Sequence, residues 1–214
     1  MHFNKDTMRE LLKIALPMVV SQGAFAVMIF TDRYFMSQID PTHMAAALGG
    51  GVACFFSFCF FSGLLSYGNA MAAQYLGAGE PEKCPKVVTQ GFIMAMMSIP
   101  ALVVITYFVS GIFENMGHDS RQVELERTYY TILMLGIVVT LAKICLSSYF
   151  AGIARTHVVM ICDVFGLIIN VPLSYVMVFG KLGFPALGIV GAGVSTIVAT
   201  ILGFLAFVSF YLAK

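Results

Sequence analysis

Charge is scarce in this sequence, and tryptophan is missing altogether. Asp, Glu, Lys and Arg together make up 11% of the 214 residues, whereas they make up about a quarter of a typical soluble domain. The net charge of +1 gives no electrostatic reason to expect a nucleic acid or a strongly acidic partner. The low charge content therefore argues against a soluble protein.

Local signatures of enzymes are missing as well. The sequence has no HExxH, GxSxG or Walker-type loop, and the glycine-rich stretch Gly188–Gly193 lacks the preceding strand pattern of a nucleotide-binding loop. Its five cysteines are scattered and include no CxxC pair, so they predict neither a disulfide framework nor a metal site. We therefore expect no enzymatic activity and no bound cofactor.

What the sequence has in abundance is long apolar runs. Hydrophobic residues make up 59% of the chain, and the mean hydropathy is +0.90. Backbone exposed to lipid must satisfy its own hydrogen bonds, and runs this long without strict alternation favour helices over a barrel. We predict an all-α membrane protein whose residues 1–214 form a single lobe of six transmembrane helices. Their approximate bounds are 11–38, 44–76, 87–113, 128–151, 158–179 and 185–212.

The distribution of basic residues predicts the orientation of the chain. With the N-terminus in the cytoplasm, the segments on that side of the membrane hold seven Lys and Arg residues, and those on the other side hold four. Cytoplasmic segments of membrane proteins carry an excess of basic residues. We therefore expect a multi-pass protein of the cell's inner (plasma) membrane with both termini in the cytoplasm.

An acidic residue interrupts the first apolar run. Asp32 follows Lys13 by 19 residues, or about 28 Å along a straight helix, which places it in the outer half of the membrane. A charge at such depth is costly unless it is paired, faces water or has a function, and we expect the adjacent Arg33 to extend outward. Asn170 and Ser174 lie at a suitable depth to hydrogen-bond Asp32 across a cavity. The alternative is that Asp32 lies in water at the outer interface.

Two further charges and a proline lie within the predicted helices. Lys143 is 16 residues after Arg127 and Asp163 is six residues after His157, which places both in the inner half of the membrane. We predict that Lys143 and Asp163 form a structural ion pair. The alternatives are a lysine that extends to the inner interface and a direct role in transport. Pro17 is predicted to bend the first helix, because proline removes a backbone donor.

Several stretches of the chain carry a family resemblance. In order they are ALPMVVSQ at Ala15–Gln22, TDR at Thr31–Arg33, AAQYLGAGE at Ala72–Glu80, ENMGHDSRQVELERTYY at 114–130, GIARTHVVMICDVFGLIINVPLSYVMVFG at 152–180 and FPALGIVGAGVSTIVAT at 184–200. Together they extend over nearly the whole chain, and they resemble the N-terminal half of a multidrug and toxic compound extrusion (MATE) transporter.

The resemblance implies secondary active export of hydrophobic, often cationic compounds, driven by an inward proton or sodium gradient. It implies twelve helices in two six-helix lobes, so the partner of this lobe is either the C-terminal lobe of the same protein, which we favour, or a second copy. It implies that Asp32 corresponds to the acid of the N-lobe cation site and that Asn170 is a polar partner of this acid. It also implies that Pro17 is the proline at which the first helix can bend. Ser174 stands where some members carry a second acid, so the coupling ion, H⁺ or a Na⁺ bound at Asp32, stays open.

Two other functions fit the sequence less well. A lipid or polysaccharide flippase of similar architecture is expected to line its cavity with several basic residues, and only Lys143 is available here. A non-transporting scaffold subunit would use its intramembrane charges for structure alone. The fourteen Met and nineteen Phe residues suit an adaptable apolar pocket.

Overall fold

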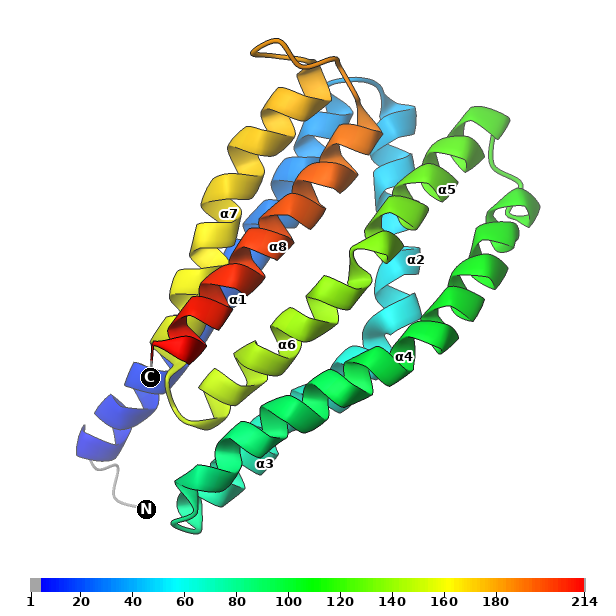
Figure 1. The fold of residues 1–214 in the computed structure, drawn as a ribbon. Coiled ribbons are helices and arrows are strands. Elements are labelled where there is room, and N and C mark those ends of the chain that lie inside the picture. Colours follow the sequence, from blue (N-terminus) through cyan, green and yellow to red (C-terminus); the bar gives the residue numbers. More distant parts are fainter. Residues whose placement is uncertain (1–4, 214) are drawn as a thin grey trace.

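The computed structural model describes residues 5–213, and within that range the chain consists of helices and connecting loops, with no strand (Figure 1). The α-helices are α1 (Lys5–Ser37), α2 (Pro41–Ser66), α3 (Gly68–Gly77), α4 (Cys84–Ile112), α5 (Ser120–Leu135), α6 (Ile137–Gly152), α7 (Thr156–Phe179) and α8 (Ile189–Leu212), and two short 3₁₀ helices are η1 (Pro81–Lys83) and η2 (Phe113–Asn115).

The helices account for five or six membrane spans in the described part of the chain. The five long, apolar stretches are Met8–Ser37, Pro41–Gly77, Pro81–Asn115, Thr156–Phe179 and Ile189–Leu212. A sixth span is obtained when α5 and α6 are counted as one broken helix, with a bend of 48° between its two parts. The prediction of an all-α membrane protein is confirmed.

Two of the six predicted helices are interrupted. The predicted helix 44–76 is divided into α2 and α3 at Tyr67, and the predicted helix 128–151 is divided into α5 and α6 at Gly136. A Cβ on Gly136 would lie 2.7 Å from Cγ1 of Ile197, so the missing side chain lets α8 pack closely against the break. Hydropathy does not register these breaks, because the chain is apolar on both sides of them.

Two helices begin earlier than predicted. α1 begins at Lys5 instead of 11, and α5 begins at Ser120 instead of 128. Asp119 caps α5 by accepting a hydrogen bond from the backbone N–H of Arg121 at 3.1 Å. The first two turns of α5 are rich in charged residues. Hydropathy therefore predicts a membrane span that begins later than the helix itself. The other predicted bounds differ from the observed ones by four residues or fewer.

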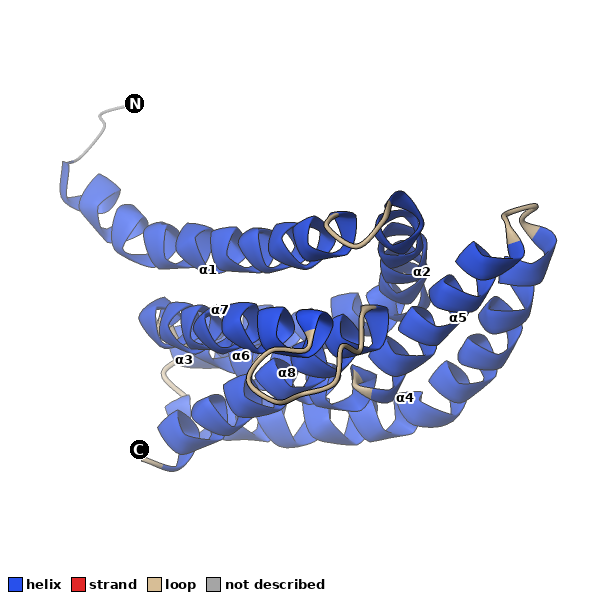
Figure 2. Ribbon diagram, turned by 90° about the horizontal axis from the view of Figure 1, so that it is seen from above, coloured by secondary structure: helices blue, strands red, loops and turns tan. Residues whose placement is uncertain are grey.

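α1 runs through Pro17 as one continuous helix. Figure 2 shows a gentle curve along α1 rather than a sharp kink at one point. α1 packs chiefly against α7, and α7 in turn packs against α8. These three helices lie side by side in Figure 1, with the N-terminal end of α1 and the C-terminus at the same end of the lobe. The trio brings together residues from both ends of the sequence.

The closest helix contact that depends on a glycine joins α6 to α3. A Cβ on Gly152 would lie 2.5 Å from the carbonyl oxygen of Asn69 and 2.7 Å from Cβ of Ala72. Overpacking of this kind costs about 1–3 kcal/mol. We expect Gly152→Ala to lower the thermal unfolding midpoint of the purified protein.

Gly63→Ala is the matched control for Gly152→Ala. Gly63 lies in α2, and nothing lies within 4 Å of the place that its Cβ would take. Because alanine favours a helix more than glycine does, Gly63→Ala should leave the midpoint unchanged or raise it. Equal effects of the two substitutions would contradict the close α3–α6 approach.

Candidate functional site

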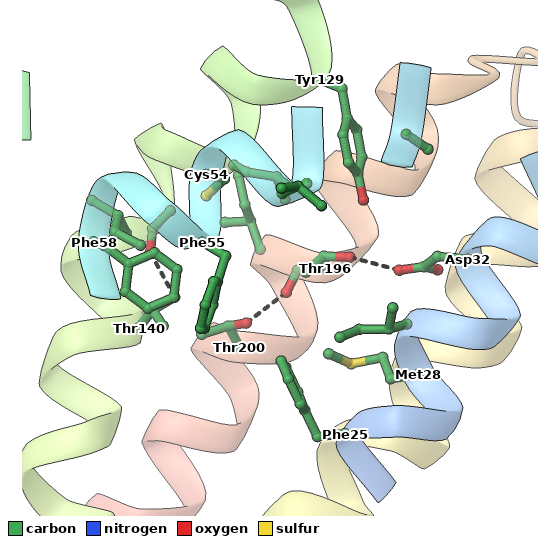
Figure 3. Close-up of a pocket in the computed structure, with 18 of the residues that line it drawn as sticks. Phe25, Met28, Asp32, Cys54, Phe55, Phe58, Tyr129, Thr140, Thr196 and Thr200 are labelled. Atoms are coloured by element: carbon green, nitrogen blue, oxygen red, sulfur yellow. Dashed lines mark hydrogen bonds between the residues drawn. The ribbon is translucent and has the colours of Figure 1, made fainter. Parts of the chain in front are cut away.

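Asp32 is buried where α1, α7 and α8 meet. Its side chain is 5% exposed, and its two carboxylate oxygens accept hydrogen bonds from two different helices. Ser174 on α7 donates to Oδ1 at 2.9 Å. The hydroxyl of Thr196 on α8 lies 3.2 Å from Oδ2 (Figure 3) and 2.9 Å from the carbonyl oxygen of Ala192, so Asp32 shares this donor with the backbone of α8. Asp32 therefore lies within the protein and not in water at an interface, and the structure brings it together with Ser174.

Asn170 belongs to the same cluster but reaches Asp32 only through Thr196. Its amide Nδ2 donates to the hydroxyl of Thr196 at 3.4 Å. Its Oδ1 is buried and has no hydrogen-bond partner among residues 5–213. An unpaired buried carbonyl costs free energy, so this oxygen is available to accept a hydrogen bond from a proton-carrying water or to contact a cation.

Thr196 belongs to this cluster although it is not among the residues predicted from the sequence. It lies one helical turn before Thr200, whose hydroxyl donates to the carbonyl oxygen of Thr196 at 2.8 Å. Two threonines four residues apart mark one face of a helix, and α8 is otherwise strongly apolar. That spacing was the available signal, but nothing in the sequence shows that this face of α8 points toward Asp32.

A cavity of about 310 Å³ opens beside Asp32. Its wall is mostly aromatic and aliphatic (Figure 3), and it also carries a few hydroxyl groups and two opposite charges, those of Asp32 and Arg33. The lining residues are Phe25, Met28, Ile29, Asp32, Arg33, Ala47, Gly51, Val52, Cys54, Phe55, Phe58, Tyr129, Leu133, Gly136, Ile137, Thr140, Thr196, Ile197 and Thr200. An apolar pocket with few polar groups is the usual form of a small-molecule site.

The second predicted pair is also brought together. Lys143 Nζ on α6 lies 2.8 Å from Asp163 Oδ1 on α7, and the hydroxyl of Ser21 on α1 donates to Asp163 Oδ2. The lysine and aspartate side chains are 24% and 19% exposed. Ser21 was not predicted to contact this ion pair. Because it lies on α1, the three residues together connect α1, α6 and α7.

No group of three or more His, Cys, Asp or Glu side chains within residues 5–213 is arranged to hold a metal ion. The cysteines of the chain are free thiols, four of them buried. A cation at Asp32 would therefore depend on one carboxylate supplemented by the oxygens of Ser174, Asn170 and Thr196.

The MatE family matches residues 17–176 of the chain. The probable multidrug resistance protein NorM of Bacillus subtilis is 29% identical over 193 residues, which is 90% of this chain and 43% of that protein. The multidrug resistance protein NorM of Vibrio vulnificus YJ016 is 31% identical over 196 residues, or 92% of this chain and 43% of that protein. The chain thus spans less than half the length of these relatives.

Solved structures share the fold. The eukaryotic MATE transporter AtDTX14 superposes with a TM-score of 0.83 at 18% identity, covering 97% of this chain and 45% of that one. The MATE transporter VcmN of Vibrio cholerae in its bent form gives a TM-score of 0.79 at 17% identity, with 96% and 46% covered. The arrangement of helices around Asp32 is therefore that of about half of such a structure.

Proposed function

The chain belongs to the MatE family, and from this premise we propose that it supplies one lobe of a secondary active exporter of hydrophobic or cationic compounds. The relatives it matches are named multidrug resistance proteins. The proposed coupling ion is a proton or Na⁺ that enters down its gradient. The proposed partner is a second lobe, either a C-terminal lobe of the same protein or a second copy of this chain.

The observation that carries this proposal is a buried carboxylate in the wall of an aromatic cavity. Asp32 lies beside the cavity that Phe25, Phe55, Phe58 and Tyr129 help to line. Aromatic faces attract organic cations, and the carboxylate of Asp32 adds a charge of the opposite sign to a wall that also carries the positive charge of Arg33. A large apolar surface with little directional hydrogen bonding also accepts ligands of varied shape.

The proposed coupling step is a change in the charge of Asp32. When it is ionised, both of its oxygens accept hydrogen bonds, from Ser174 on α7 and from Thr196 on α8. Binding of a proton turns one acceptor oxygen of Asp32 into a donor, so the hydrogen bonds that join α1 to α7 and α8 must rearrange. Uptake of an ion at Asp32 would thus change how α1 packs and how strongly the cavity attracts a cation.

A second lobe has a specific part in this proposal. Carriers with parallel repeats alternate access by moving two lobes around a shared central site. The cavity beside Asp32 would supply half of that site, and the facing lobe the opposite wall. In a scaffold subunit, by contrast, the same contacts would hold helices together without any flux.

The proposed export is tested in a bacterial strain that lacks its own multidrug pumps and produces the protein from its complete gene. We expect lower steady-state accumulation of ethidium, a fluorescent hydrophobic cation, than in cells with the empty vector. Dissipating the proton gradient, or omitting sodium, should remove the difference and identify the ion. Unchanged accumulation in cells whose membranes contain the folded protein would contradict the proposal.

A further inference from the structure

A second hollow lies between α4 and α5, away from Asp32 and its cavity. It has a volume of about 800 Å³, and its lining residues come from the C-terminal part of α4, from η2 and from residues 127–135 of α5. The connection between α4 and α5 lies at the end of the lobe opposite the described chain ends (Figure 1). The lining residues are Val103, Thr106, Tyr107, Phe108, Ser110, Gly111, Glu114, Arg127, Thr131, Met134 and Leu135.

The body of this α4–α5 groove is suited to hydrocarbon. Tyr107 and Leu135 are 80% and 76% exposed, on helices that belong to membrane spans. The hydroxyls of Thr106 and Thr131 donate to backbone carbonyls one turn earlier, those of Leu102 and Arg127, so they seek no ligand. An unfilled hollow loses dispersion contacts along its whole wall. In a bilayer, acyl chains are the molecules at hand to fill it.

One end of the groove carries both signs of charge. Glu114 lies in η2 and Arg127 on α5, and Arg127 Nη1 donates to Glu114 Oε1 at 2.9 Å. Both side chains are more than half exposed, and exposed ion pairs contribute about 0–1 kcal/mol. Because the pair is weak, a ligand can replace it. Such a ligand would offer a phosphate to Arg127 and, beside it, an ammonium to Glu114.

We propose that the α4–α5 groove is a binding site for a phospholipid with a phosphoethanolamine headgroup. Arg127 binds the phosphate, which matches the fork of donors on a guanidinium. Glu114 accepts hydrogen bonds from the primary ammonium, and the acyl chains lie along the apolar wall. A quaternary ammonium has no N–H to donate to Glu114, and a glycerol headgroup brings no cation for it. The proposal does not depend on which compound the protein exports.

The test is native mass spectrometry of the full protein in detergent, supplied with equal amounts of phosphatidylethanolamine, phosphatidylcholine and phosphatidylglycerol. We expect phosphatidylethanolamine to be retained about tenfold more than the other two, because hydrogen bonds between charged groups contribute on this scale. The double variant Glu114→Gln, Arg127→Gln should lose that preference. Equal retention of the three lipids by the wild type, or an unchanged preference in the double variant, would overturn the proposal.

Two further variants separate the groove from general effects of charge and folding. Arg121→Gln is the matched control, because Arg121 bonds Asp40 at 3.0 Å outside the groove; it should keep the preference. Thr131→Phe leaves both charges in place and narrows the groove, so it should reduce retained lipid of every headgroup. Undiminished lipid retention in a folded Thr131→Phe protein would place the lipid elsewhere and overturn the assignment.

Discussion

Replacing Asp32 with asparagine is expected to abolish gradient-driven export. Asparagine has nearly the same shape and keeps a carbonyl oxygen that can accept from Ser174 or Thr196, so the helices should still pack. It can neither release a proton nor carry the negative charge that would hold a cation. Initial rates of ethidium transport in proteoliposomes under an imposed proton or sodium gradient should fall to the level of protein-free vesicles.

Glu82→Gln is the matched control for this substitution. Glu82 is an exposed acid in η1, far along the chain from the cluster, and its neutralisation should leave transport at the wild-type rate. The amount and thermal unfolding midpoint of Asp32→Asn should stay close to those of the wild type. Full transport by a folded Asp32→Asn protein would remove Asp32 from the coupling step and leave the membership of the family untouched.

The depth of each residue along its helix was sufficient to predict from the sequence that Asp32 and Ser174 lie close together. Helices in a membrane are nearly parallel and have a fixed rise of about 1.5 Å per residue, so residues at equal depth are candidates for contact. The 2.9 Å bond between these two side chains follows that reasoning. The same arithmetic predicted the meeting of Lys143 and Asp163.

Depth does not reveal which faces of the helices meet, and Glu126 illustrates the consequence. Glu126 lies outside the helix predicted for 128–151, yet in the structure it belongs to α5 and is 1% exposed. Its carboxylate accepts from Gln122 Nε2 at 2.9 Å and lies 3.1 Å from His118 Nδ1. The space that the carboxylate occupies adjoins Gly49 on α2, where a Cβ would lie 2.6 Å from Glu126 Oε1 and the carboxylate would have to move. That space depends on a residue 77 positions earlier in the chain.

The largest expected effect on stability concerns the link between α1, α6 and α7. Removing one partner of a buried ion pair costs about 3–5 kcal/mol, because the other charge is left without compensation. About a fifth of each side chain of the Lys143–Asp163 pair is exposed, so we expect a loss near the lower end of that range. Lys143→Met and Asp163→Asn should each lower the free energy of unfolding in an SDS titration of the purified protein.

The double variant Lys143→Met, Asp163→Asn should recover part of this loss, because neither member of the pair is then left as an isolated charge. The amide oxygen of the new asparagine side chain would still be able to accept from Ser21, so the contact between α1 and α7 should persist. A double-mutant cycle gives the interaction energy of the two residues directly. Strictly additive losses would show that Lys143 and Asp163 are held near each other by the helices and contribute no stabilising interaction of their own. A non-additive cycle would mean that their attraction helps to fix how α6 packs against α7, which is one of the three helices that position Asp32.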